Sequence, residues 1–150
     1  MTSHPPAEFG VSAIDHVAYP VRDLNQALEF IARVLGSGQL RDPYVVNGTV
    51  AVQQVPVGDA MLSLHQVGNG ISLAAPAAVP GSLDICFNWT GPIGSAVDHL
   101  RAARVAIIEG PVERLNAKGE RGWSVYFRDA ELNLFELHST TLEPQAPASP

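Results

Sequence analysis

The sequence predicts an α+β fold made of two tandem βαβββ modules. Three observations support this: strand and helix patterns follow the same order twice, a connector rich in Gly, Ala and Pro separates the two halves, and 46% of the 150 residues are apolar. A chain of this length and composition forms a hydrophobic core without disulfide support. The residues leave one alternative open, a ferredoxin-like or other α+β sandwich with accidental symmetry.

The first half begins with a strand at residues 13–19, which are rich in β-branched and aromatic side chains. A helix follows, because Asp23 and Gln26 form a capping-box pattern, apolar residues recur at helical spacing, and Gly36 ends the run. Asn47-Gly48 then predicts a tight hairpin. The three strands of this half are expected at residues 39–46, 49–57 and 61–66.

The second half repeats this order. Gly110-Pro111 and a polar segment interrupt its last strands. The expected elements are a strand at 82–89, a helix at 92–103 and strands at 105–108, 124–127 and 132–138.

One domain is therefore expected over residues 11–140. It comprises module one at about 12–67, a linker at about 67–81 and module two at about 82–139. The two ends, residues 1–10 and 141–150, are rich in Pro, Ala and small polar residues and are expected to be disordered.

Composition excludes several classes of function. The formal net charge is -6 and the nine Lys and Arg residues are scattered, which argues against a nucleic-acid partner. A signal-peptide pattern and an 18-residue apolar window are both missing from the sequence, so we expect a cytoplasmic protein without a membrane partner. The single Cys86 allows no internal disulfide and favours a reducing compartment; its strand context predicts a core residue.

Four polar residues stand out within the predicted strands: His16, His65, Asp84 and Glu136. Under a duplication, His16 is expected to correspond to Asp84, and His65 to Glu136. Two imidazoles and two carboxylates converge if the two sheets face each other. Such a set of nitrogen and oxygen donors suits a divalent transition metal: Ni, Zn, Co, Mn or Fe.

Each of these residues taken alone has an ordinary structural explanation, and the pairing is what favours a site. A strand histidine is commonly a satisfied core or rim residue. We expect His138 at the rim, His99 facing water and His4 in the tail. Four aromatic residues are candidates for either the core or a ligand groove: Trp89, Trp123, Tyr126 and Phe127.

Several segments resemble the vicinal-oxygen-chelate superfamily, which includes glyoxalase I, extradiol dioxygenases and bleomycin-binding proteins. They are IDHVAYPVRDLNQALEF (14–30), LSLHQ (62–66), SLDICF (82–87), AVDHLRAARVAIIEGPVER (96–114) and SVYFRDAELNLFEL (124–137). LHQ with LDICF looks like the subgroup labelled glyoxalase domain-containing protein five or virulence-associated glyoxalase-like proteins.

The resemblance implies curved, cup-like mixed sheets around a metal, frequently completed across a homodimer interface. Carried over by position, the metal ligands are His16, a residue at or beside His65, Asp84 and Glu136. Two positions depart from glyoxalase I. There the position of Asp84 is usually His, and the module-one carboxylate falls nearest Ser63. The turn before the last strand also departs from its usual Asp-Pro-Asp-Gly-Asn form, since residues 129–133 read Asp-Ala-Glu-Leu-Asn.

The resemblance implies a metal-dependent lyase or isomerase of the glyoxalase type. The same resemblance implies a small oxygen-chelating substrate and an enediolate-like intermediate, with Glu136 as ligand and catalytic base. A metal-free protein that binds an antibiotic or another small molecule is the alternative. A non-haem Fe(II) dioxygenase is a further alternative, although such enzymes take their second His from the position that Asp84 fills here.

Overall fold

The computed structural model describes residues 10–11, 13–36 and 39–141, and it contains two four-stranded mixed sheets and two helices. Most of both expected tails lies outside these residues. Module one comprises β1 (His16–Val21), α1 (Leu24–Leu35), β2 (Tyr44–Val46), β3 (Thr49–Val57) and β4 (Ala60–Gln66). Module two comprises β5 (Asp84–Asn88), α2 (Ile93–Ala102), β6 (Ile107–Leu115), β7 (Arg121–Arg128) and β8 (Leu134–Ser139).

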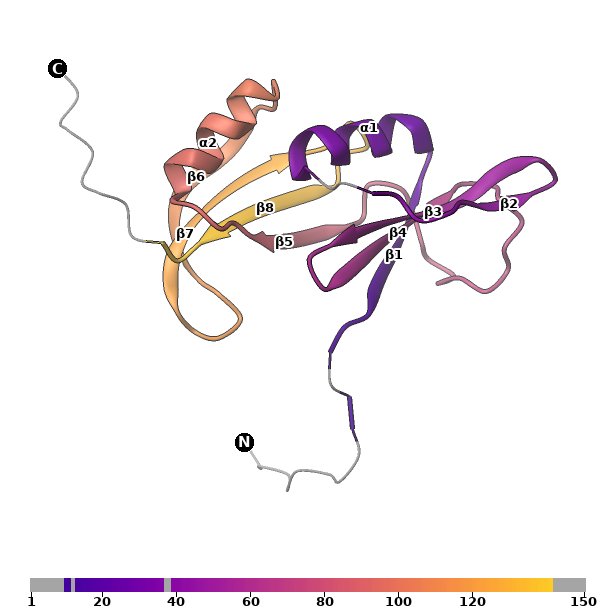
Figure 1. The fold of residues 1–150 in the computed structure, drawn as a ribbon, viewed down its shortest axis with the longest axis horizontal. Helices are drawn as coiled ribbons and strands as arrows, with labels where there is room; N and C mark the ends of the chain where they lie inside the picture. Colours follow the sequence, from indigo (N-terminus) through magenta and orange to yellow (C-terminus); the bar gives the residue numbers. More distant parts are fainter. Residues whose placement is uncertain (1–9, 12, 37–38, 142–150) are drawn as a thin grey trace, which may run out of the picture.

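The strand orders are β1-β4-β3-β2 and β5-β8-β7-β6, so both sheets have the same topology (Figure 1). In each sheet the first strand pairs in parallel with the last strand of its module, and the other pairs are antiparallel. The predicted α+β fold of two tandem βαβββ modules is confirmed.

Local signals in module one act as the sequence predicts. The Asp23 side chain accepts a hydrogen bond from the backbone N–H of Gln26 at 3.0 Å, and Gly36 ends α1 in the left-handed region with φ of 63°. Asn47 and Gly48 both have positive φ, as a tight hairpin turn requires. The strand expected at 39–46 is shorter: β2 begins at Tyr44, and its register with β3 shifts between Tyr44 and Val45. Pro43, directly before it, has no N–H to donate to β3.

In module two, β6 is longer than predicted and runs through Gly110-Pro111. Two register irregularities, between Ile107 and Glu109 and between Glu109 and Val112, accommodate this segment. β6 is also an edge strand, where a proline that cannot donate a hydrogen bond is tolerated. Gly110 has φ of 104°, and a Cβ there would collide with the Ser124 carbonyl oxygen.

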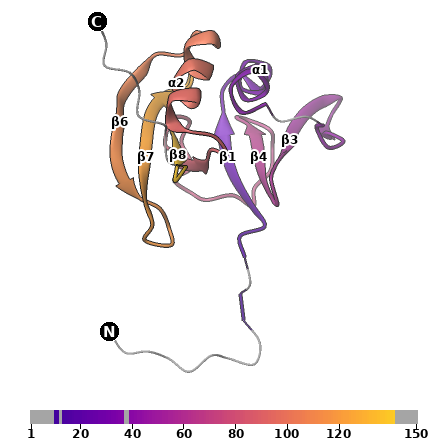
Figure 2. The same ribbon diagram turned by 60° about the vertical axis from the view of Figure 1, so that its left-hand side comes forward.

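The two modules pack side by side, and both helices lie on the same side of the sheets (Figures 1 and 2). Phe30 and Val34 of α1 belong to the core cluster of module two, where the rings of Phe30 and Phe135 lie 5.7 Å apart. Four residues contact both core clusters: Leu35, Leu83, Ile85 and Phe87. Among the residues that the structure describes, no helix lies on the opposite face of either sheet. Neither helix of the described chain is long and apolar enough to cross a membrane.

Candidate functional site

The open face of module one carries an imidazole pair, His16 and His65. His16 begins β1 opposite Met61, and His65 lies further along β4 opposite Pro20, so strand alternation places both imidazoles on the face away from α1. The pKa of His65 is lowered first by burial and then by the charge of His16. Pro20, the strand partner of His65, lies four residues along β1 from His16. His16 also pairs with Asp15, with 2.8 Å between Nδ1 and Oδ2.

The open face of module two carries a carboxylate pair, Asp84 and Glu136. Cys86 lies opposite Glu136 in the parallel β5–β8 pair and two residues from Asp84 on the same face. Burial and the two carboxylates raise the pKa of the Cys86 thiol to about 12. Cys86 was expected in the core, but it is exposed on this face because β5 turns its other side chains, Ile85 and Phe87, toward the core.

Two buried residues support Glu136. The Ser124 hydroxyl is 2.6 Å from Oε2 of Glu136 and 2.7 Å from Nδ1 of His138. His138 was expected at the rim, but it is 2% exposed, because Gly122 on β7 leaves room for the ring against the backbone. Ser124 was not among the residues expected at the site. Strand alternation could have identified it. In residues 124–127 and 135–138, alternation places Ser124 and Tyr126 on the same face as Glu136 and His138.

Tyr126 and Arg114 extend the group of polar side chains around Glu136 on the open face of module two. Nε of Arg114 donates to the Tyr126 hydroxyl at 3.2 Å, and the guanidinium lies over the Tyr126 ring. Burial raises the pKa of Tyr126, the hydrogen bond from Arg114 lowers it, and the charge of Glu136 raises it. Tyr126 therefore faces the carboxylate, whereas Phe127 is fully buried in the core.

The strand register corrects the expected correspondence between modules. Ala18 pairs with Ser63, and Cys86 pairs with Glu136, so Ser63 is the structural counterpart of Glu136. By the same register His65 corresponds to His138, because they pair with Pro20 and Asn88. The match of His65 with Glu136 was wrong, whereas the match of His16 with Asp84 holds, since each begins its module's first strand.

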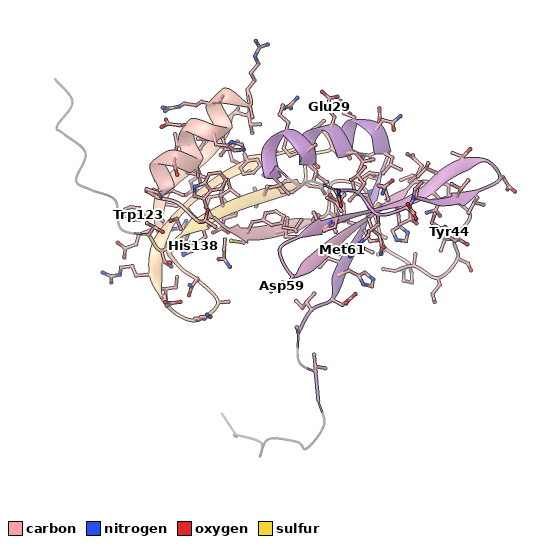
Figure 3. The ribbon with its side chains drawn as sticks, viewed as in Figure 1. Glu29, Tyr44, Asp59, Met61, Trp123 and His138 are labelled. Carbon is pink, nitrogen blue, oxygen red and sulfur yellow. The ribbon has the colours of Figure 1, made fainter. Side chains whose placement is uncertain are left out.

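One chain does not bring the two pairs together. Among the described residues, no three His, Cys, Asp or Glu side chains form a group that can hold a metal ion. Figure 3 shows His138 on the sheet of module two and Met61, the partner of His16, on the sheet of module one. The ligand set of His16, His65, Asp84 and Glu136 stays a prediction.

His99 does not face water as expected. Its Nε2 atom is 2.6 Å from the carbonyl oxygen of Val34, and its ring contacts Trp89 with centroids 5.3 Å apart. His99 therefore ties α2 to the end of α1 and has a structural role.

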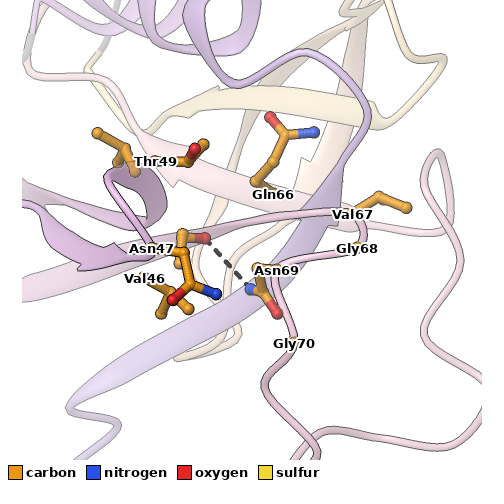
Figure 4. A pocket seen from close by; sticks show the side chains of 10 residues that line it. Val46, Asn47, Thr49, Gln66, Val67, Gly68, Asn69 and Gly70 are labelled. Atoms are coloured by element: carbon orange, nitrogen blue, oxygen red, sulfur yellow. Dashed lines mark hydrogen bonds between the residues drawn. The ribbon is translucent and has the colours of Figure 1, made fainter.

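A cavity of about 350 Å³ lies between the β2–β3 hairpin and the loop after β4 (Figure 4). None of the four candidate ligands lines it. Asn69 in its wall is satisfied internally, since its Nδ2 donates to the Ala51 carbonyl at 3.2 Å and its Oδ1 accepts from the Ile71 N–H at 2.9 Å. This cavity is a loop-packing feature.

Comparison with known families agrees with this architecture. Residues 13–137 match the Glyoxalase/Bleomycin resistance protein/Dioxygenase superfamily, and the chain belongs to it. The resemblance read from the sequence is confirmed.

Particular relatives cover nearly the whole chain. The virulence protein STM3117 of Salmonella typhimurium is 32% identical over 134 residues, which are 89% of this chain and 88% of that protein. Its crystal structure superposes with a TM-score of 0.76 at 30% identity, over 89% of this chain and 100% of the solved chain. The integron cassette protein VCH_CASS1 of V. cholerae has a TM-score of 0.77 at 31% identity, covering 89% and 98% of the two chains.

More distant solved structures share the fold. TnmS3, an antibiotic-binding protein from Streptomyces sp. CB03234, is 22% identical with a TM-score of 0.68, covering 89% and 100% of the two chains. A mutant of the fosfomycin resistance protein FosX from Listeria monocytogenes, complexed with Mn(II) and a dihydroxypropylphosphonic acid, is 23% identical with a TM-score of 0.56, covering 89% and 94%. The fold thus occurs in a protein that binds an antibiotic and in one complexed with a metal.

Proposed function

We propose that the protein is a metal-dependent lyase or isomerase of the glyoxalase type, with each active site assembled from two copies of the chain. The observation that carries the proposal is the division of the donors. Module one presents the imidazole pair on its open face, and module two presents the carboxylate pair on its own.

The donor set fits a divalent transition metal. Neutral imidazole nitrogens and carboxylate oxygens are good ligands for Fe, Mn, Co, Ni and Zn. A bound cation supplies Lewis-acid stabilisation of negative charge on two adjacent substrate oxygens.

Two copies are needed because of how the modules pack. Within a chain, α1 and β5 join the modules side by side through their cores, which keeps the imidazole pair apart from the carboxylate pair. A two-fold dimer that sets module one of each chain against module two of its partner completes two equivalent sites. We therefore propose a homodimer.

Glu136 is the residue proposed to move the proton. Its carboxylate is partly exposed on the open face and is held at Oε2 by Ser124. A fixed carboxylate beside a chelated substrate can take the proton from a carbon next to a carbonyl and return it to the neighbouring carbon. Because Ser63 replaces the second carboxylate, we propose a small chelating substrate other than the glutathione hemithioacetal.

Complementation tests this arrangement. His16→Ala and Glu136→Gln are each expected to abolish stoichiometric metal binding, measured by elemental analysis after loading with Mn(II) and gel filtration. When the two variants are co-expressed, about half of the dimers are mixed by random pairing, and each mixed dimer keeps one intact site. Metal binding is then partly restored. Glu29→Gln, at an exposed carboxylate on α1, is the matched control and keeps full binding.

Two outcomes contradict the proposal in different ways. Failure of complementation, with wild-type binding intact, places the site within one chain. Wild-type protein that takes up no stoichiometric metal favours the alternative function, metal-free binding of a small molecule on the same open faces.

A further inference from the structure

A chain of hydrogen bonds links three side chains on the open face of module two. Ser124 joins Nδ1 of His138 at 2.7 Å to Oε2 of Glu136 at 2.6 Å. Ser124 is 0% exposed and His138 is 2% exposed, so water does not compete for the bond between them.

Counting protons fixes the direction of this chain. An ionised carboxylate only accepts hydrogen bonds, and a serine hydroxyl has a single proton. The Ser124 proton therefore goes to Glu136, and the Ser124 oxygen accepts from His138. This requires the Nδ1–H form of His138, and it agrees with the second ring nitrogen, since Nε2 is buried without a hydrogen-bond partner.

Module one shows that the fold does not require this chain. Val52 lies opposite His65 as Ser124 lies opposite His138, so the same strand position accepts an apolar residue beside a histidine. Ser63 replaces Glu136 in that module. The hydroxyl opposite the histidine therefore accompanies the carboxylate: both occur in module two, whereas module one has Val52 and Ser63 at the two corresponding positions.

We propose that Ser124 and His138 are positioning residues, which hold Oε2 of Glu136 and so fix the direction in which its carboxylate faces a ligand. The inference rests on the proposed role of Glu136. Partners that orient a metal-binding carboxylate set its geometry and its basicity, and their loss weakens metal affinity although they do not touch the metal. The same fixed orientation aims the carboxylate at one position of a bound substrate.

Affinity for Mn(II), measured by titration with detection of free Mn(II) by electron paramagnetic resonance, tests the proposal. Ser124→Ala is expected to weaken affinity roughly 10- to 100-fold, and Ser124→Thr, which keeps the hydroxyl, restores most of it. Ser139→Ala is the matched control. It removes another buried hydroxyl of the same sheet, which donates to the Gly91 carbonyl and not to Glu136, and it leaves affinity unchanged.

The outcomes separate the two proposals. If Glu136→Gln loses affinity for Mn(II) but Ser124→Ala binds Mn(II) as tightly as wild type, the positioning role is overturned. Unchanged affinity of Glu136→Gln instead contradicts the proposed function.

The tautomer of His138 can be measured on the wild-type protein, so this test does not depend on whether a variant folds. Long-range ¹⁵N NMR of the metal-free protein at neutral pH is expected to show the His138 ring protonated at Nδ1 and bare at Nε2. Ser124→Ala, which removes the acceptor of that proton, is expected to shift the ring toward the Nε2–H form. A wild-type His138 protonated at Nε2 alone overturns the proposal whatever the metal affinities are.

Discussion

Glu131, in the turn between β7 and β8, accepts a hydrogen bond from the backbone N–H of Arg22 at 2.6 Å. The contact joins the two modules directly before α1 begins. The carboxylate side chain is 8% exposed, and its other oxygen lies 3.4 Å from the backbone nitrogen of Asp23. The turn at residues 129–133, which departs from the usual form of the superfamily, thus has a structural role. Its glutamate binds the backbone directly before α1 and so connects the two modules.

Replacing this glutamate is expected to loosen the joint between the modules. Glu131→Ala removes the charged acceptor of the Arg22 backbone N–H, so the free energy of unfolding should fall by about 1–3 kcal/mol. Urea denaturation followed by circular dichroism measures it. The exposed Glu29, which pairs with Arg33 at 3.7 Å, is the control, and Glu29→Ala should change stability by less than about 0.5 kcal/mol. Equal losses of stability in Glu131→Ala and Glu29→Ala would contradict the role of Glu131 in connecting the two modules.

Gly122 is expected to tolerate no side chain. A Cβ there would lie 2.7 Å from Nε2 of His138 and even closer to the Ser139 carbonyl oxygen. Gly122→Ala should therefore displace His138 and lower the free energy of unfolding by about 1–3 kcal/mol, as overpacking does. Thermal unfolding measures the loss, and the His138 resonances should shift. Gly10→Ala, where a Cβ meets open space, is the control. If Gly122→Ala is as stable as this control, the backbone moves to accommodate the added Cβ and the prediction is wrong.

The sequence predicted the fold well because its signals are local. Asp23 and Gly36 bound α1 as capping rules require, and Asn47-Gly48 forms the expected turn. Strand alternation also placed His16 and Glu136 on the open faces, because the period of a strand fixes the face of each side chain.

What the sequence could not predict depends on pairing between distant segments. Alternation assigns a face but not a register, so His65 was matched with Glu136 although its counterpart is His138. The Ser124 contact joins β7 to β8, and the His99 contact joins α2 to the end of α1. Neither partner is visible in the residues that flank these positions.

Cys86 is expected to react slowly with thiol reagents although it is exposed. Because its pKa is raised from 9.0 to about 12 by burial, Glu136 and Asp84, the reactive thiolate is scarcer than in an ordinary cysteine. Alkylation by iodoacetamide near pH 8 should be roughly two to three orders of magnitude slower than for a free cysteine. Glu136→Gln removes one cause and should accelerate the reaction, whereas Glu29→Gln should not. A rate near that of free cysteine would show that the carboxylates do not act on the thiol.

The stability of the metal-free protein is expected to depend on pH through His65. Burial, and secondly the charge of His16, lower the pKa of His65 below its ordinary value of 6.5. Between the lowered folded pKa and 6.5 the unfolded chain binds more protons than the folded chain, so the contribution of His65 to stability is full above about pH 6.5 and is lost as the pH falls. Urea denaturation between about pH 5 and pH 7.5 should show this slope, which His65→Gln reduces.

NMR titration of the His65 ring should give a midpoint below 6.5. His16→Ala should raise this midpoint without restoring the ordinary value, because burial is the larger cause. A midpoint that is unchanged in His16→Ala would mean that the two imidazoles are too far apart to share one cation.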